Sequence, residues 1–172
     1  IIGLNTIQDG NLTVFDGNES KVVEDLRGYV SLVPQEVYIN DGSVEENLRI
    51  YTNIQSEDNE RIISSVRASC LTDAEATANE INQFLTHKIA KSLSGGERKR
   101  LAFARAFYQQ KGLMMIDEGT SGLDNETKNI LLDVIFANQK LSVLFITHDH
   151  DILDRFDKVL LLKGGTLKEL QH

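Results

Sequence analysis

The sequence contains few of the features that mark several classes of protein. It has one cysteine, Cys70, which excludes an intramolecular disulfide framework, favours a reducing compartment and is expected to fill the core on a helix. One proline and no long glycine and serine tract leave no evident linker. No apolar run approaches the roughly 20 residues of a membrane-spanning helix. Acidic residues outnumber basic ones, 26 to 18, and the net charge of −8 argues against a nucleic-acid-binding surface.

The composition that remains is typical of one globular domain. The chain has 172 residues, of which 41% are hydrophobic and 26% are charged, and this length is enough to bury a core.

The most informative segment is residues 91–100, KSLSGGERKR. Ser94 and Glu97 have the spacing of a capping box, so a helix is expected to begin here, and Ser43 and Glu46 predict the start of a short helix upstream in the same way. Gly95 and Gly96 carry no Cβ, which lets a ligand approach the backbone closely. Free amide groups and the positive end of the helix dipole suit a phosphate. Taken alone, the pattern also fits an ordinary capped helix after a glycine turn.

Two apolar runs later in the chain are followed by polar residues that could carry out chemistry. Residues 113–116 are apolar at four successive positions, which predicts a parallel strand buried on both faces, and Asp117 and Glu118 follow it. Residues 142–146 predict a second buried strand, and His148 comes two residues after it. Adjacent carboxylates can also be a solvated turn, and a lone histidine after a strand is usually structural.

A third candidate lies upstream, at Gln35. Residues 29–33 predict a strand that ends at Pro34, and α/β folds place ligands at this end of their strands. A neutral amide there can coordinate Mg²⁺ and orient water without adding charge. The alternative is a plain surface glutamine.

In this order, four segments resemble the motifs of ABC-type ATPases, and the resemblance covers nearly the whole chain. Residues 33–36 (VPQE) resemble the Q-loop, residues 93–97 (LSGGE) the signature, residues 112–124 the Walker B motif with the D-loop, and residues 147–149 (THD) the H-loop. Gly119 and Gly122 stand where the family usually has proline and alanine, and we expect both to loosen the backbone there.

The resemblance assigns a role to each candidate residue. Glu118 would be the general base that polarises the attacking water. His148 would contact the γ-phosphate and orient Glu118. Asp117 and Gln35 would bind Mg²⁺. The residues implied to bind ATP are Gln35, Ser94, Gly95, Gly96, Glu97 and Asp124, and Asp124 also fits the N-cap of a helix running to about residue 138.

One family motif, the P-loop, is missing from the sequence. The pattern G-x-x-x-x-G-K-[ST] does not occur, and residues 1–4 resemble the end of the helix that begins at this loop. We therefore expect the chain to begin just after the P-loop. We also expect the isolated chain to bind ATP weakly or not at all and not to hydrolyse it.

The predicted fold is α/β and P-loop NTPase-like, with a mainly parallel sheet, flanking helices and antiparallel edge strands. Residues 1–172 would be one N-terminally incomplete ABC-type ATPase domain with an inserted helical subdomain at about residues 52–111. Within it, residues 56–90 predict two helices, the second after a Thr72–Glu75 capping box. Residues 10–17 predict a short antiparallel strand, and residues 159–162 a last core strand.

The resemblance implies an ATP-binding and ATP-hydrolysing domain of an ABC transporter, acting with Mg²⁺ at the cytoplasmic face of a membrane. Its expected partners are a second ABC ATPase domain, held head to tail, and a transmembrane domain, with no nucleic acid. Residues 26–48 resemble exporters more than importers. Two alternatives remain: a catalytically silent ABC half that lends its signature face to a partner, and a soluble ABC-type ATPase without a membrane domain.

Overall fold

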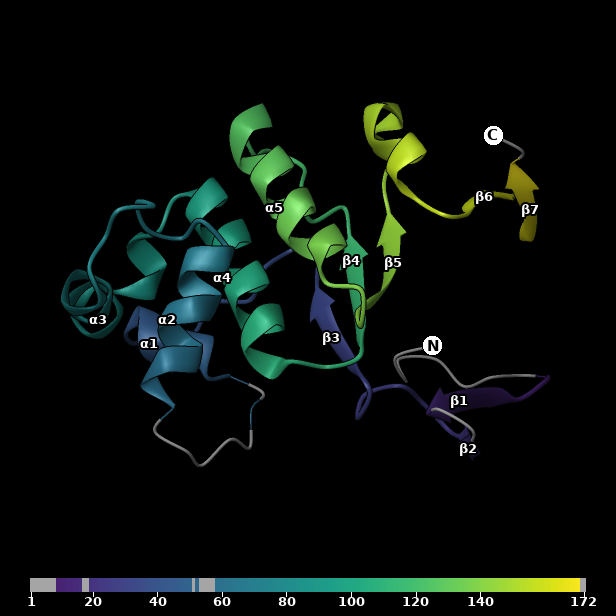
Figure 1. Cartoon of the computed structure of the whole chain (residues 1–172), viewed down its shortest axis with the longest axis horizontal. Helices are drawn as coiled ribbons and strands as arrows, with labels where there is room; N and C mark the ends of the chain where they lie inside the picture. Colours follow the sequence, from purple (N-terminus) through teal and green to yellow (C-terminus); the bar gives the residue numbers. More distant parts are fainter. Residues whose placement is uncertain (1–8, 17–18, 51, 53–57, 171–172) are drawn as a thin grey trace.

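A short parallel sheet lies at the centre of the molecule (Figure 1). The computed structural model describes residues 9–16, 19–50, 52 and 58–170, so the prediction for residues 1–4 lies outside the described part. The strands of this sheet, in spatial order, are β3 (Val30–Val33), β4 (Leu113–Asp117) and β5 (Ser142–Ile146). Both pairings are parallel, so the carboxyl ends of all three strands lie along one edge.

Two helices, α4 (Gly95–Gln109) and α5 (Asn125–Ala137), cover one face of this sheet. Met114 and Ile116 of β4 point to this face and pack with Phe103 and other apolar side chains of both helices. Burial of these side chains supplies the main attraction between the helices and the sheet.

The opposite face of β4 is covered as well. Met115 packs there with Val30, and apolar side chains of β1 (Leu12–Asp16) and β2 (Glu19–Val23) contact this cluster. β4 is therefore enclosed on both faces, as its run of apolar residues predicts. β1 and β2 pair antiparallel, which confirms the strand predicted at residues 10–17.

A second core joins the helices at the other end of the molecule (Figure 1). These helices are α1 (Val44–Leu48), α2 (Asn59–Ala68) and α3 (Ala78–His87). α4 contributes Leu101, Ala104 and Tyr108 to this core, while its other side packs on the sheet. The two cores therefore share α4. The division of the chain into domains stays a prediction.

Capping boxes begin α1 and α4 as the sequence predicts. Ser43 caps α1 together with Glu46, and Ser94 caps α4 together with Glu97. In each case the serine hydroxyl accepts the third N–H of the helix, and the glutamate carboxylate accepts the N–H of the serine.

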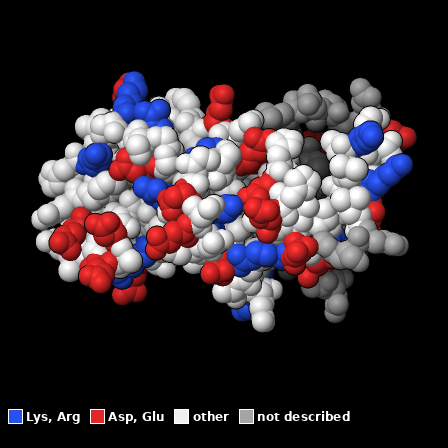
Figure 2. All heavy atoms as spheres, turned by 90° about the horizontal axis from the view of Figure 1, so that it is seen from above, with Lys and Arg blue, Asp and Glu red and all other residues white. Residues whose placement is uncertain are grey.

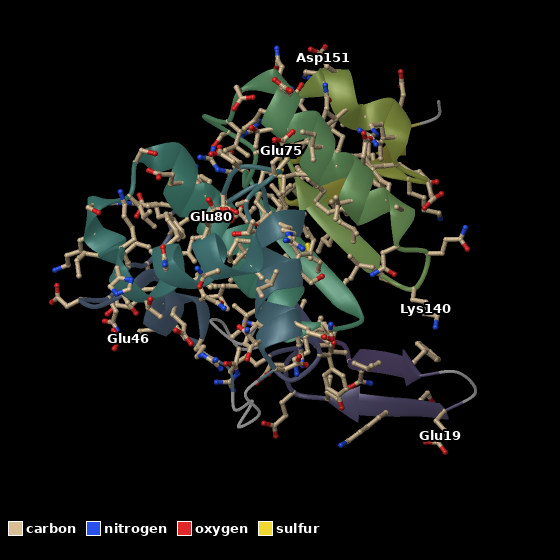
Figure 3. All side chains as sticks on the ribbon, turned by 60° about the vertical axis from the view of Figure 1, so that its left-hand side comes forward. Glu19, Glu46, Glu75, Glu80, Lys140 and Asp151 are labelled. Carbon is tan, nitrogen blue, oxygen red and sulfur yellow. The ribbon has the colours of Figure 1, made fainter. Side chains whose placement is uncertain are left out.

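The start predicted for α3 is wrong. Its capping box is Thr77 with Glu80, whose carboxylate accepts the N–H of Thr77 at 2.8 Å, and not Thr72 with Glu75. Both pairs have the same spacing, so spacing alone does not choose between them, and Ile81 of the helix that follows Thr77 lies in the core. Figure 3 shows Glu75 and Glu80 at separate places along this part of the chain.

Three expectations about burial are corrected by the structure. Cys70 is half-buried and belongs to none of the core clusters of the described residues, and it follows α2 in a left-handed turn with φ of 53°, so it is not part of a helix. β5 is an edge strand of its sheet with residues exposed at alternate positions, so it is not fully buried. β6 (Val159–Lys163) is not a core strand, because Leu160, Leu161 and Leu162 are 51%, 45% and 67% exposed.

The antiparallel strands form sheets of their own and do not extend the parallel sheet. β6 pairs antiparallel with β7 (Thr166–Leu170) across a turn at Gly164 and Gly165, and β1 pairs antiparallel with β2.

None of the described helices has the length and apolar character needed to span a membrane. Acidic and basic side chains are interleaved across the face seen in Figure 2.

Candidate functional site

Three side chains predicted from separate segments meet at the carboxyl edge of the parallel sheet. Gln35 Nε2 donates a hydrogen bond of 2.8 Å to Glu118 Oε2. His148 Nε2 lies 2.9 Å from Glu118 Oε1. Gln35 follows β3, Glu118 follows β4 and His148 follows β5, so the pairing of the strands brings the three together.

The geometry of Glu118 suits a group that acts on a ligand. Its backbone is left-handed with φ of 48°, a conformation that is uncommon for residues other than glycine. Its N–H donates to the carbonyl oxygen of Ile146 at 2.9 Å, which fixes this turn against β5. Its side chain is 24% exposed, whereas the His148 side chain is 90% exposed. The carboxylate is therefore held by its neighbours and still reached from solvent.

A hollow of about 250 Å³ lies beside Glu118 and His148. Glu118 and His148 line it together with the loop that begins α5, from Thr120 to Leu123, and with Lys128. Gly122 belongs to this loop and has φ of +77°, where a side chain would be strained.

Gly119, next to Glu118, has a packing role that differs from the expected loosening. A Cβ at this position would lie 2.7 Å from Val33 Cγ1 and 2.8 Å from Ile116 Cγ2. The turn after β4 is therefore pressed against the sheet, and residue 119 has no room for a side chain.

Asp117 ends β4 beside this group and is half-buried. The Lys99 ammonium lies near both Asp117 and Glu118, and it donates to the main-chain carbonyl oxygen of Gln35. Burial lowers the pKa of Lys99, and the nearby carboxylates oppose this shift. Carboxylate and amide oxygens are ligands that Mg²⁺ accepts, with phosphate and water oxygens completing its shell. Asp117 and Gln35 therefore fit Mg²⁺ as a partial ligand set.

Ser94, Gly95, Gly96 and Glu97 lie at the start of α4, and the side-chain hydrogen bonds of Ser94 and Glu97 stay within its first turn. A Cβ on Gly95 would meet nothing within 4 Å, so the backbone there is open to a ligand. Glu97 instead accepts the N–H of Ser94 at 2.7 Å, and its hydrogen bonds with Ser94 lower the pKa of its carboxyl. Among the described residues, no hydrogen bond or ion pair joins Ser94 or Glu97 directly to Glu118.

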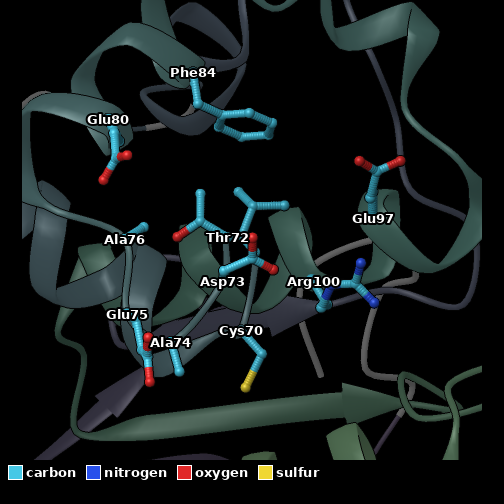
Figure 4. A pocket seen from close by; sticks show the side chains of 11 residues that line it. Cys70, Thr72, Asp73, Ala74, Glu75, Ala76, Glu80, Phe84, Glu97 and Arg100 are labelled. Carbon is cyan, nitrogen blue, oxygen red and sulfur yellow. The ribbon is translucent and has the colours of Figure 1, made fainter.

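A larger hollow of about 850 Å³ adjoins the signature helix (Figure 4). Glu97 and Arg100 of α4 line one side of it, and Phe84 and Glu80 of α3 line another. Cys70, in the turn after α2, lies at its floor in this view, and burial raises the pKa of its thiol.

Asp124 is the N-cap of α5, as the sequence predicts. Its two oxygens accept hydrogen bonds of 2.8 Å from the N–H and the hydroxyl of Thr127. These bonds, the one from the N–H first, hold the pKa of Asp124 below its usual value. A role of Asp124 in binding ATP stays a prediction.

Sequence reasoning missed an ion pair beside His148. Lys128 Nζ of α5 lies 2.8 Å from Asp149 Oδ2, and both side chains are mostly buried. The hydrogen bond with Lys128 lowers the pKa of Asp149. The pair holds the turn after β5 against α5 and so helps to fix His148. No sequence spacing signals it, because the partners come from different elements.

Comparisons with known proteins agree with this arrangement of a parallel sheet and polar strand ends. A family model described as "ABC transporter" matches residues 1–121, and the chain therefore belongs to the ABC transporter family. Membership implies a nucleotide as the ligand. Asp124 and His148 lie beyond the matched residues.

Two curated relatives and one solved structure show how far the likeness extends. The chain is 31% identical over 160 residues to the lactococcin-G-processing and transport ATP-binding protein LagD of Lactococcus lactis, covering 92% of this chain and 23% of that protein. It is 28% identical over 172 residues to the mycobactin import ATP-binding/permease protein IrtB of Mycolicibacterium smegmatis, covering 98% of this chain and 29% of that protein. This chain thus spans less than a third of the length of either relative.

The solved structure is that of a bacterial Atm1-family ABC exporter with ATP bound. It matches with a TM-score of 0.73 at 21% identity, over 90% of this chain and 29% of that chain. The P-loop NTPase-like α/β fold predicted from the sequence is confirmed by this match.

Proposed function

We propose that this chain is the ATP-binding and ATP-hydrolysing domain of an ABC transporter that exports its substrate across a membrane. The observation that carries the proposal is the contact of Gln35 and His148 with opposite oxygens of Glu118. A carboxylate held in this way, half-enclosed beside a hollow, suits a general base that acts on a water molecule. Membership of the family supplies ATP as the substrate class.

In this mechanism the residues position the attacking water and stabilise charge on the phosphates, because phosphoryl transfer needs little covalent chemistry from the protein. Glu118 accepts a proton from the attacking water. Gln35 and His148 keep the carboxylate aimed, and the exposed ring of His148 is free to approach the γ-phosphate. Asp117 and Gln35 are the residues that would hold Mg²⁺, and the ion would supply positive charge to offset the charge of the phosphates.

The signature acts toward a second ABC domain. Ser94, Gly95 and Gly96 present an open helix start that suits the phosphates of a nucleotide held by the partner, in a head-to-tail pair. Glu97 and Asp124 would contact the same nucleotide. In this structure their carboxylates cap their own helices, so we expect them to change hydrogen-bond partners when the two ABC domains close on the nucleotide.

A transmembrane domain completes the proposed transporter, which places this chain at the cytoplasmic face. The name of LagD includes the word transport, the name of IrtB includes the word import, and the matched structure is that of an exporter. The proposal of export follows the exporter-like residues 26–48 and the fold match.

The proposal is tested with inverted membrane vesicles that contain the native protein. Mass spectrometry measures which solutes of a cell extract accumulate inside them when MgATP is added. ATP-dependent accumulation that Glu118→Gln abolishes supports export, and ATP-dependent depletion of the vesicle lumen contradicts it. The matched control is Glu19→Gln, a charge change of the same kind on the exposed β2 strand.

The same material separates the two alternatives. Transport that is unchanged by Glu118→Gln would favour a silent half that lends its signature to a partner. Recovery of the native protein in the soluble fraction, with MgATP turnover intact, would favour an ABC-type ATPase without a membrane domain.

A further inference from the structure

Lys99 connects the signature helix to the proposed general base, Glu118, through Gln35. The backbone of Gln35 contacts Lys99, and its side chain contacts Glu118. Lys99 lies in the first half of α4, and its ammonium donates to the main-chain carbonyl oxygen of Gln35. The side chain of Gln35 donates in turn to Glu118 Oε2 at 2.8 Å. The path from the helix to the carboxylate therefore runs through a single intervening residue.

The neighbouring basic residues do not share this contact. Arg98 donates to the carbonyl oxygens of Leu93 and Lys91, just before the helix. Arg100 lines the hollow beside Glu97. Of the three successive basic residues, Lys99 is the one whose side chain donates to Gln35 at the carboxyl edge of the sheet.

The charges around Lys99 match this position. Its ammonium is partly buried and lies among the carboxylates of Glu118, Asp117 and Glu36. Partial burial of a lysine is unfavourable unless opposite charges and acceptors surround it, and here both are present. The ammonium thus offsets repulsion among carboxylates that have to stay close together.

The hold on the Gln35 backbone has a geometric consequence for Glu118. Gln35 Nε2 and His148 Nε2 occupy the two oxygens of the carboxylate from different sides. A shift of the Gln35 main chain moves the first of these donors and turns the carboxylate. Catalytic groups lose rate steeply when displaced by about 1 Å.

We propose that Lys99 is a positioning residue that sets the orientation of Glu118 through Gln35 and links it to the position of the signature helix. The proposal rests on the proposed hydrolysis of ATP. When the start of α4 moves with a bound nucleotide, Lys99 moves the Gln35 backbone and with it the donor to Glu118. The ligand-facing end of α4 and the base are then coupled within one chain.

The test uses the native protein that contains this chain and measures kcat and KM for MgATP. Lys99→Met removes the ammonium and keeps the apolar stem, whereas Lys99→Arg keeps the charge and the donors. The matched control is Lys111→Met, because Lys111 Nζ donates to the Gly28 carbonyl oxygen at 2.9 Å, away from Glu118. Thermal melting of each variant is measured in parallel.

We expect Lys99→Met to lower kcat about tenfold or more while KM stays within about threefold. Lys99→Arg should recover most of kcat, and Lys111→Met should leave both constants unchanged. A kcat of Lys99→Met within about twofold of wild type would overturn the proposal, as would Lys99→Arg being no better than Lys99→Met. If Lys99→Met melts early, Lys99→Leu, which also lacks a donor and keeps an apolar side chain, replaces it under the same criteria.

The design separates this proposal from the proposed function. Wild-type turnover that Glu118→Gln abolishes, with Lys99→Met fully active, overturns the role of Lys99 alone. A wild-type protein without MgATP turnover overturns both.

Discussion

Gln35 Nε2 donates a 2.8 Å hydrogen bond to Glu118 Oε2 across 83 positions of the sequence. The contact joins the segment after β3 to the segment after β4, at the edge where parallel strands present their carboxyl ends. With His148 on the other oxygen, it makes Glu118 the centre of the site.

Removal of the Gln35 amide should slow hydrolysis without unfolding the protein. Gln35 is exposed, so Gln35→Ala leaves no cavity, but it frees one oxygen of Glu118. We expect kcat for MgATP to fall about tenfold to a hundredfold in the native protein, as when a positioned donor is lost. The control is Gln83→Ala, an exposed glutamine on α3. Equal kcat values for Gln35→Ala and wild type would contradict this role.

Gly119 should tolerate no side chain. In Gly119→Ala the new Cβ would lie within 3 Å of Val33 and Ile116 side chains, both enclosed in the core. We expect the free energy of unfolding in urea to fall by about 1–3 kcal/mol, the usual cost of overpacking. Gly112→Ala serves as the control, because its Cβ would meet nothing within 4 Å. Equal stability of the two variants would contradict this prediction and would show that the turn after β4 shifts to make room for the added methyl group.

The Lys128–Asp149 pair should make the free energy of unfolding decrease as the pH falls into the acidic range. The pKa of Asp149 is lowered in the folded protein, so the folded state favours the charged carboxylate. The resulting stability is present above the unfolded pKa, near pH 4, and is lost as the pH falls through the folded pKa.

The measurement for this pair is urea unfolding of wild type and Asp149→Asn over a range of pH. The variant should be less stable than wild type near neutral pH, and the gap should narrow as the pH falls below about 4. Asp157→Asn, on the exposed surface after the 3₁₀ helix His150–Arg155, is the control. A gap that does not change with pH would show that the pair does not act through its charge.

Local signals in the sequence predicted local structure well. The caps at Ser43, Ser94 and Asp124 depend on residues within one helical turn, and all three are confirmed. The start of α3 was not decided by spacing, because Thr72 and Thr77 both have a glutamate three positions later. In the structure the helix begins after Thr77, and its residues Ile81 and Leu85 pack in the core.

Burial and long-range contacts were harder to predict. The apolar run in β6 has the composition of a core strand, but its hairpin partner β7 leaves its leucines exposed. The contact of Gln35 with Glu118 depends on the order of strands in the sheet, which no single segment contains. The contact of Lys99 with the Gln35 backbone and the Lys128–Asp149 pair have no sequence pattern at all. They arise only when helices pack on the sheet.

Steady-state turnover of MgATP by the native wild-type protein and by Glu118→Gln, compared side by side, tests the central claim most directly. If Glu118 is the general base, wild type turns over and Glu118→Gln falls at least about a hundredfold while still binding ATP. The isolated 172-residue chain, assayed in the same way, is expected to bind ATP weakly and to show no turnover. Turnover by Glu118→Gln at the wild-type rate would contradict the account.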